Sequence, residues 1–257
     1  MKEIRKINDK IDQFVFSEED NDLEINITAI YHKNKVLLID AGYIPQALAV
    51  KKHLDMKGIE VTDLVLTHYH PDHAAGANVF EKAKLSCSWH YEENYINCNE
   101  RWHASHAYRK PDETIKDRDE ITFGETSLVF YEAPGHSECS LIILINNKIL
   151  HVGDLIMADA YGCSALPYIS IGGSFEEHIE SLEMIQSMAP NQLLLSHGIP
   201  IISKSDIKEV IKKRLFYLKS VIKSQGKEDL ENLLIGGSDA WCLTKWHPYN
   251  LKNYKIK

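Results

Sequence analysis

The sequence predicts an α/β protein in which two β-sheets pack face to face and helices cover both outer surfaces. Short apolar runs typical of strands alternate with amphipathic stretches typical of helices, and several runs follow one another closely enough to form hairpins. A chain of 257 residues with 44% hydrophobic residues can bury a core of this size. The expected strands cover residues 25–31, 36–39, 64–66, 85–88, 127–131, 141–145, 149–152 and 193–195.

Two helices are predicted among these strands. Residues 45–57 carry apolar side chains at helical spacing and end at Gly58, a residue that favours a helix stop. Residues 174–188 begin with Ser174, and Glu177 follows three positions later. That spacing is the pattern of a capping box, in which the two residues satisfy free amide groups of the first helical turn.

The C-terminal part of the chain is predicted to be helical as well. Residues 207–234 show amphipathic spacing, and a second short stretch follows at 241–249. We therefore expect a main domain formed by residues 1–200 and a helical extension, residues 201–257, that packs on it.

Four potential metal ligands lie in the segment THYHPDH at residues 67–73, directly after an apolar run. His68 and His70 alternate along an extended chain, so both side chains can point to the same side. Asp72 and His73 follow the bend that Pro71 favours and can face a second ion. Histidine clusters also occur on solvated loops, but this spacing is typical of a metal-binding loop. One short loop could thus serve two metal ions.

Three further potential ligands lie at the ends of later strands. Two metal ions that share a water molecule need about three protein ligands each and a bridging carboxylate. His136, Asp154 and His197 each follow an apolar run that is predicted to be a strand, and Gly153 lets the backbone turn tightly before Asp154. Any one of them alone could be structural. Their shared position at strand ends predicts a single metal centre.

From about residue 26 to residue 198 the chain resembles the metallo-β-lactamase-fold hydrolase superfamily. The segment Leu-Leu-Ile-Asp-Ala-Gly at 37–42 resembles an early strand-end turn of that family, in which Asp40 would support the metal loop from beneath. The resemblance implies a four-layer αββα sandwich, here with a short C-terminal helical tail. It also implies that seven residues hold two divalent metal ions: His68, His70 and His136 on one ion, Asp72, His73 and His197 on the other, and Asp154 between them.

The implied cofactors are two divalent ions, with zinc expected for a histidine-rich site and iron or manganese as alternatives. Two such ions lower the pKa of a shared water molecule and polarise the bond that is attacked. Asp72 and Asp154 are the predicted catalytic residues, because their carboxylates can accept and return the proton. No serine or cysteine nucleophile is required.

The predicted function is hydrolysis of an ester-type bond, such as a thioester or lactone, in a small-molecule substrate. The alternatives are a phosphodiesterase of the same fold, a mono-iron enzyme similar to persulfide dioxygenases, and a non-catalytic binding module. Acyl-homoserine lactonases carry a tyrosine three residues after the bridging aspartate, where this chain has Met157. Basic residues that would bind glutathione carboxylates, as in glyoxalase-type thioesterases, cannot be placed in the tail.

Composition and charge exclude several other classes. A net charge of −8 argues against a nucleic-acid binder, which needs clustered Lys and Arg to neutralise phosphates. The sequence contains neither a membrane-spanning run nor a secretory signal, so no membrane partner is expected. Five scattered cysteines suit a reducing compartment and predict a cytoplasmic protein. The oligomeric state stays open, with a homodimer as one possibility.

Two segments are predicted to shape the substrate site. The first, residues 98–119, is rich in aromatic, histidine and arginine side chains, and Trp102, His103 and His106 are its possible substrate contacts. An ordinary surface insertion is the alternative. The second, residues 157–173, follows Asp154 and contains Tyr161 and Tyr168; Tyr161 is the possible substrate contact there. His151 either forms a hydrogen bond near the metals or fills a polar niche in the core.

Overall fold

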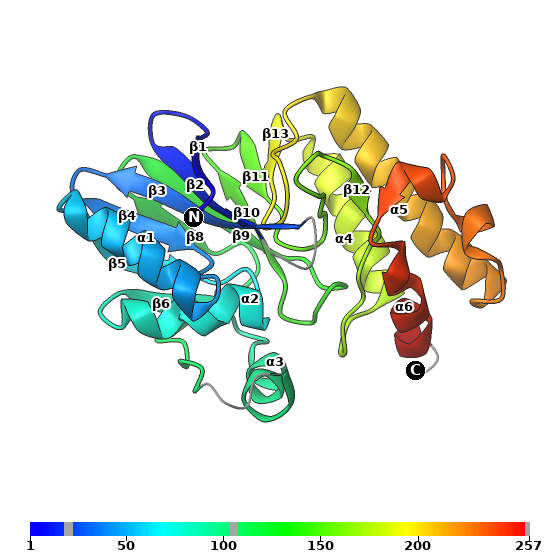
Figure 1. Ribbon diagram of the computed structural model, residues 1–257, viewed down its shortest axis with the longest axis horizontal. Coiled ribbons are helices and arrows are strands. Elements are labelled where there is room, and N and C mark those ends of the chain that lie inside the picture. Colours follow the sequence, from blue (N-terminus) through cyan, green and yellow to red (C-terminus); the bar gives the residue numbers. More distant parts are fainter. Residues whose placement is uncertain (18–22, 103–106, 255–257) are drawn as a thin grey trace.

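The computed structural model describes residues 1–17, 23–102 and 107–254 (Figure 1). Two β-sheets form its centre. The first sheet has seven strands in sequence order: β1 (Glu3–Lys6), β2 (Ile11–Ser17), β3 (Glu24–His32), β4 (Lys35–Ile39), β5 (Glu60–Val65), β6 (Lys84–Ser88) and β7 (Glu113–Ile115). The second has the order β13 (Gln192–Leu194), β11 (Ile149–His151), β10 (Leu141–Ile145), β9 (Thr126–Glu132) and β8 (Glu120–Phe123). Two short parallel strands, β12 (Ser164–Ala165) and β14 (Trp241–Cys242), form a third, small sheet.

Each large sheet is mixed. The first is antiparallel from β1 to β4 and parallel from β4 to β7. The second is antiparallel except for the parallel pair of β11 and β13. Parallel neighbouring strands must be joined by a crossover connection, because a tight hairpin cannot link them.

The α-helices are α1 (Ile44–Met56), α2 (Pro71–Ala74), α3 (Glu92–Asn97), α4 (Phe175–Met188), α5 (Lys204–Ser224) and α6 (His247–Tyr254).

Shorter helical turns complete the chain. They are the 3₁₀ turns Ala75–Phe80, Leu230–Leu233, Ser238–Ala240 and Thr244–Trp246, and a π-helical turn at Cys98–Trp102.

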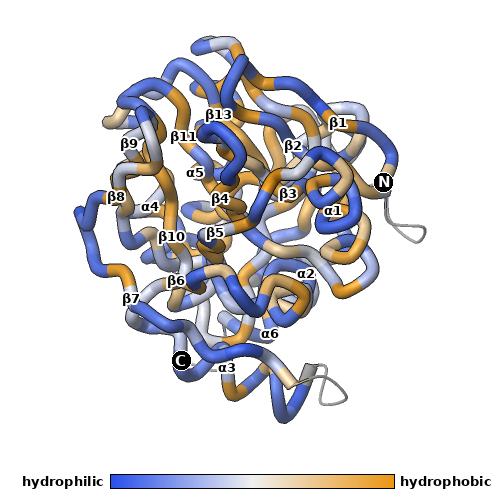
Figure 2. The backbone as a smooth tube through the Cα atoms, turned by 90° about the vertical axis from the view of Figure 1, so that its left-hand side faces the viewer, coloured by the Kyte–Doolittle hydropathy of each residue, from blue (hydrophilic) through white to orange (hydrophobic). Residues whose placement is uncertain are grey.

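The two large sheets pack face to face through apolar side chains that alternate along the strands. Leu37 and Ile39 of β4 lie in the same buried cluster as Phe130 of β9 and Ile143 of β10. Side chains alternate between the faces of a strand, so the neighbours of Leu37 and Ile39 face the opposite way. Figure 2 shows the hydrophobic stretches gathering along central strands such as β4, β5 and β10.

Helices cover the outer face of each sheet. On the first sheet, Leu38 of β4 shares a buried cluster with Val50 and Leu54 of α1. On the second, α4 and α5 contribute Leu182 and Leu218 to another buried cluster. Figure 1 shows α1 on one side of the sheets and α4 with α5 on the other. The order helix, sheet, sheet, helix confirms the predicted α/β sandwich. Full burial of each such side chain contributes about 1.5–3 kcal/mol.

All eight expected strands and the two expected main helices are present, with bounds that shift by a few residues. Ser174 accepts a hydrogen bond from the Glu177 amide at 3.3 Å, and Gly58 follows α1 with a φ of +66°. The strands β1, β2, β7, β8, β12 and β14 were not expected. β2 carries the polar residue Gln13 inside its buried run, where its side chain donates to Thr28 and to the Leu195 carbonyl.

The C-terminal segment after residue 200 packs on the second sheet. Residues Ile207, Tyr217 and Leu218 of α5 lie in the buried cluster that also contains α4. The division into a domain 1–200 and an extension 201–257 stays a prediction. In the described part of the chain, no helix combines the length and apolar character that a membrane span requires.

Gly135 gives a test of how closely the loop before His136 packs on α4. An added Cβ would lie 2.3 Å from the Cα of His178, and the backbone φ is +129°. Gly135→Ala should therefore lower the free energy of unfolding by about 2–4 kcal/mol through overpacking and backbone strain. Thermal or urea unfolding measures the loss.

Gly58→Ala is the matched control. Its φ is also positive, at +66°, but nothing lies within 4 Å of an added Cβ. It should cost only about 1–2 kcal/mol, the strain of a left-handed alanine. Equal losses in the two variants would contradict the close contact between Gly135 and α4.

Candidate metal centre

The THYHPDH segment follows the end of β5 and continues into α2, which begins at Pro71. His70 is extended, with φ −113° and ψ 157°, and Pro71 then opens the helical turn that carries Asp72 and His73. Proline suits this first helical position because it has no amide hydrogen to leave unpaired. The change from extended to helical backbone sends the two halves of the segment toward different neighbours.

The seven predicted ligands come together in two groups, and in each group the potential ligand atoms lie within 4.8 Å of one another. Both groups contain Asp154. Its Oδ2 lies 3.6 Å from His136 Nε2, and its Oδ1 lies 3.4 Å from both His73 Nε2 and His197 Nε2. The first group is His68, His70, His136 and Asp154, and the second is Asp72, His73, Asp154 and His197.

The nitrogen atoms of the first group converge closely. His70 Nδ1 lies 2.9 Å from His68 Nε2 and 3.0 Å from His136 Nε2. Three imidazole nitrogens on one tetrahedral zinc ion would be roughly 3.3 Å apart, given zinc–nitrogen bonds of about 2.0–2.1 Å. The donor set therefore fits a divalent metal ion with small adjustments.

In three of the histidine rings, Nδ1 faces away from the centre and forms a hydrogen bond that fixes the orientation of the ring. His136 Nδ1 bonds to the carbonyl of Tyr168 at 2.8 Å, and His197 Nδ1 bonds to the carbonyl of Glu24 at 2.8 Å. His73 Nδ1 bonds to Asp40 Oδ2 at 2.8 Å. A carbonyl or carboxylate accepts a hydrogen bond from Nδ1–H, so in the neutral ring Nε2 is left with a lone pair directed toward the centre.

Asp40 lies beneath the centre and ties its parts together. This buried residue has a φ of +64°, in the turn after β4. Its Oδ1 accepts from the Thr67 amide at 2.8 Å, and its Oδ2 accepts from the Ser196 hydroxyl at 3.0 Å and from His73. These contacts agree with the supporting position that the resemblance implies for Asp40.

The carboxylates of the centre need positive charge close by to balance them. Burial lowers the pKa of His70 to about 3, so this ring is neutral. Burial also lowers the pKa of His197, but Asp154 and Asp72 outweigh it and raise the pKa to about 10. For His73 the carboxylates likewise outweigh burial and raise the pKa well above its usual value. Divalent ions would replace these protons as the balancing charge and leave the imidazoles neutral, the form that ligates a metal.

Two buried atoms of the centre give an independent test of fit. His73 Nε2 and Asp154 Oδ1 are buried and form no hydrogen bond, and they approach each other only to 3.4 Å as an ion pair. A buried polar atom without a partner costs free energy, and metal coordination removes that cost. The two atoms belong to the second group, so the residues present fit an ion there as well.

A pocket of about 320 Å³ opens onto the centre. Its polar part is formed by residues of the two ligand groups, including Asp72, which is 23% exposed. Its apolar part comes from distant segments of the chain. The Tyr168 ring lies 5.8 Å from the His136 ring and 5.2 Å from the Trp246 ring. The apolar and aromatic lining residues are Leu23, Tyr43, Met157, Tyr168, Ile171 and Trp246.

The sequence analysis named Tyr168 among these wall residues, but only as a member of the segment 157–173. Tyr43 and Trp246 were missed, because neither lies in a ligand motif. Trp246 belongs to the C-terminal segment and reaches the pocket only through the packing of that segment on the second sheet. The one signal in the sequence was the aromatic content of residues 241–249.

The one predicted substrate contact that the structure describes in full, Tyr161, lies away from the pocket. Tyr161 is 83% exposed and does not line the pocket, because it lies in a tight turn in which Asp159 Oδ1 accepts from the Tyr161 amide at 2.8 Å. His103 and His106 lie outside the described residues, as does the side chain of Trp102. These three contacts stay predictions.

The segment 98–119 takes part in the fold at both ends. Cys98 and Tyr108 are buried in the cluster beneath α1, and residues 113–115 form the edge strand β7. Besides any contact with substrate, the segment therefore contributes a cysteine and a tyrosine to the core.

His151 is fully buried at the end of β11 and belongs to neither ligand group. Its Nδ1 accepts a hydrogen bond from the Gly153 amide at 3.4 Å. Burial lowers its pKa to about 4, so the ring is neutral. It supports the turn that carries Asp154, and its Nε2 is buried without a hydrogen-bond partner. The hydrogen bond from Gly153, close to the predicted ligands, corresponds to the first of the two roles considered for His151.

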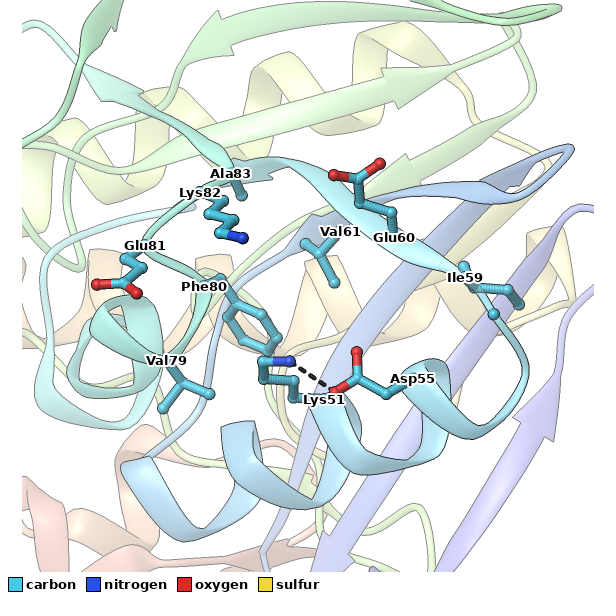
Figure 3. A pocket seen from close by; sticks show the side chains of 11 residues that line it. Lys51, Asp55, Ile59, Glu60, Val61, Val79, Phe80, Glu81, Lys82 and Ala83 are labelled. Atoms are coloured by element: carbon cyan, nitrogen blue, oxygen red, sulfur yellow. Dashed lines mark hydrogen bonds and ion pairs between the residues drawn. The ribbon is translucent and has the colours of Figure 1, made fainter.

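A larger hollow, about 550 Å³, lies between α1, the start of β5 and the residues after Val79. Figure 3 shows Lys51 and Asp55 paired at its side, 2.6 Å apart, with Phe80 nearby. None of the seven predicted ligands lines it. Of these two hollows, the 320 Å³ pocket is the one lined by potential ligands.

Comparisons with known proteins agree with this picture. The family model for the metallo-beta-lactamase superfamily matches residues 20–197. A hydroxyacylglutathione hydrolase of Fuscovulum blasticum is 27% identical over 182 residues, which are 68% of this chain and 62% of that protein. Another from Bdellovibrio bacteriovorus is 25% identical over 182 residues, which are 66% of this chain and 65% of that protein. The chain therefore covers less than two thirds of the length of these relatives.

Solved structures show the same fold. A metallo-beta-lactamase from Pontibacter korlensis superposes with a TM-score of 0.66 at 18% identity, covering 84% of this chain and 98% of that one. The DIM-1 metallo-beta-lactamase gives a TM-score of 0.64 at 15% identity, covering 82% of this chain and 96% of that one. The family match extends over more than half of the chain and confirms both the predicted family and the predicted fold. This chain belongs to the metallo-beta-lactamase superfamily.

Proposed function

We propose that the protein is a hydrolase with two divalent metal ions, which cleaves an ester-type bond, in the first place a thioester, of a small molecule. The observation that carries this proposal is the pair of ligand groups that share Asp154 at the floor of a pocket. Superfamily membership and the similarity to hydroxyacylglutathione hydrolases support a metal-dependent hydrolase and a thioester substrate.

The proposed ligands follow the two groups. His68, His70 and His136 would hold one ion, and Asp72, His73 and His197 the other, with Asp154 between them. Zinc is the expected metal, because imidazole and carboxylate donors at these spacings suit it; iron and manganese accept the same donors. When bound, the ions make a water molecule acidic and polarise the bond under attack.

The protein groups supply the remaining steps. Asp72 faces the pocket, and its Oδ2 lies 3.2 Å from His197 Nε2, so its carboxylate can take a proton from the attacking water and return it to the leaving group. Asp154 is more deeply buried and holds the two groups in register. Tyr168 and Trp246 bind the apolar part of the substrate and exclude water from it.

The pocket wall favours a carbonyl substrate over a phosphodiester. Among the described residues that line it, none is a lysine or an arginine. A phosphodiester carries a negative charge beside the bond that breaks, and enzymes that use such substrates usually bind it with basic side chains. Thioesters and lactones are uncharged at the reacting carbon. The phosphodiesterase is therefore the second candidate.

A mono-iron enzyme and a non-catalytic binding module fit the donors less well. Neither would need the second group, in which Asp72, His73 and His197 converge. We also propose that the protein works in the cytoplasm, because all five cysteines carry free thiols, as is usual in a reducing compartment.

Metal analysis and a substrate panel test the proposed function. We expect at least two divalent ions per chain after reconstitution, and loss of activity when a chelator removes them. Among a thioester, a lactone, a β-lactam and bis-nitrophenyl phosphate, the thioester should have a kcat/KM at least about tenfold above the phosphodiester, a difference of about 1.4 kcal/mol in the barrier. Metal content that never exceeds one ion would refute the two-metal proposal.

Asp72→Ala tests the assigned proton acceptor. The variant should lose more than about tenfold in kcat/KM, a barrier increase above about 1.4 kcal/mol, while its thermal transition stays close to that of the parent protein. Asp72 lies on a short helical turn, where its side chain contacts His197 rather than the core. Asp55→Ala, on the far hollow, is the control and should keep full activity. Survival of activity in Asp72→Ala would remove this residue from the mechanism.

Asp40→Asn tests the support beneath the centre. The amide cannot accept all of the bonds that the carboxylate accepts from Thr67, His73 and Ser196. We expect metal affinity to fall by about 10–100-fold, measured by competition with a coloured chelator. Asp63→Asn, on the neighbouring strand β5, should leave the affinity unchanged. Equal affinities in both variants would show that Asp40 does not tune the metal centre.

A further inference from the structure

Three potential metal ligands lie close together outside the centre described above. They are Asp159, Cys163 and Cys242, and their carboxylate and sulfur atoms lie within 4.8 Å of one another. Asp159 and Cys163 belong to the turn that follows Asp154. Cys242 comes from the C-terminal segment.

The small sheet of β12 and β14 brings these residues together. Ala165 of β12 is in register with Cys242 of β14, and the Leu166 amide donates to the Cys242 carbonyl at 3.0 Å. The Cys242 thiol also donates to the Cys163 carbonyl at 3.4 Å. The backbone thus fixes the two thiols side by side although they are far apart in the sequence.

The turn that carries Asp159 is built around one of its carboxylate oxygens. Asp159 Oδ1 accepts from the amides of Tyr161 and Cys163, both at 2.8 Å. These bonds hold Asp159 and Cys163 in fixed relative positions and leave Oδ2 as the oxygen that could face an ion. Asp159 is buried, and the two cysteines are half-buried, so an ion can reach the cluster from solvent.

A buried positive charge lies beside this cluster. Arg214 of α5 is almost fully buried and donates to the Ala165 carbonyl at 3.0 Å and to the Ser164 hydroxyl at 3.1 Å. Within the described part of the chain, its hydrogen-bond acceptors are neutral groups and it forms no ion pair. A buried guanidinium is stabilised by a neighbouring anionic group.

We propose that Asp159, Cys163 and Cys242 bind a thiophilic divalent cation such as zinc, with water as a fourth ligand. Both thiols would lose a proton to solvent as the two metal–sulfur bonds form. Two thiolates and one carboxylate around a doubly charged ion leave one net negative charge, which the guanidinium of Arg214 balances. Thiolates favour zinc over harder ions such as magnesium or calcium.

The distances suit such an ion. Zinc–sulfur bonds of about 2.3 Å and zinc–oxygen bonds of about 2.0–2.2 Å place tetrahedral donor atoms roughly 3.4–3.8 Å apart. The three ligand atoms are already within 4.8 Å of one another, so changes of side-chain rotamer are enough. The bound ion would join the turn after Asp154 to the segment that carries Trp246, and so brace the pocket wall.

Cobalt(II) distinguishes this site from the proposed catalytic centre, because neither ligand group of that centre contains sulfur. We expect Co²⁺, added to the metal-free, fully reduced protein, to produce the near-ultraviolet charge-transfer absorption of thiolate–cobalt bonds. The band should persist in Asp72→Ala. It should disappear in Cys163→Ser with Cys242→Ser, and that double variant should bind one equivalent of metal fewer than the parent protein.

Two single variants refine the test. Asp159→Asn keeps an oxygen that can accept the two amide hydrogen bonds but removes the carboxylate, so the affinity for Co²⁺ at this site should fall at least about tenfold. Cys87→Ser is the matched control. Its thiol donates to the Ser88 carbonyl, which a hydroxyl can also do, and it should keep the whole band.

A measurement on the parent protein alone covers the case in which the double variant does not fold. Zinc should slow the alkylation of the half-buried Cys163 and Cys242 by iodoacetamide, as read by peptide mass mapping, whereas the buried Cys87 should stay unmodified with or without zinc. Absence of both the charge-transfer band and the protection in the folded, reduced protein would overturn the proposal. Persistence of the band in a folded double variant would do so as well. Both readouts are independent of hydrolytic activity.

Discussion

The hydrogen bonds of Asp40 hold the two groups of predicted metal ligands in one place. A single buried carboxylate receives donors from the end of β5, from α2 and from the residues after β13. Hydrogen bonds to a charged group contribute about 1.5–3 kcal/mol each. They connect segments of both large sheets, so the carboxylate fixes how the sheets meet at this edge. The left-handed backbone at Asp40 is the local cost of turning its side chain under the loop.

The centre depends on the packing of two sheets, because neither sheet carries it alone. The first sheet supplies the loop with His68 to His73, and the second supplies His136, Asp154 and His197. Direct backbone bonds join the two sides: the Leu141 amide donates to the Thr67 carbonyl at 2.8 Å. Changes that loosen the apolar contacts between the sheets therefore also separate the two sets of donors.

Sequence reasoning reached the fold and the set of residues at the centre for a physical reason. The loop at 67–73 and the residues His136, Asp154 and His197 each lie within a few residues of the end of a strand, and strand ends that share a sheet edge bring the following residues together. The strands at the N-terminus were not expected, because buried polar residues such as Gln13 interrupt their apolar pattern and are satisfied only by tertiary contacts. The pocket wall was missed for a related reason. Tyr43 and Trp246 lie far from the ligand motifs, and no local pattern shows which distant segments will meet.

The wall and the centre are nevertheless coupled through Tyr168. Its carbonyl orients His136, and its ring contacts both that imidazole and Trp246. The C-terminal segment thus touches a residue that positions a donor of the centre. Arg214 donates a hydrogen bond to the carbonyl of Ala165, in the segment between Asp154 and Tyr168. The pocket wall thus depends on the contact between the C-terminal segment and the loop after Asp154, whereas the predicted ligands come from the strand ends.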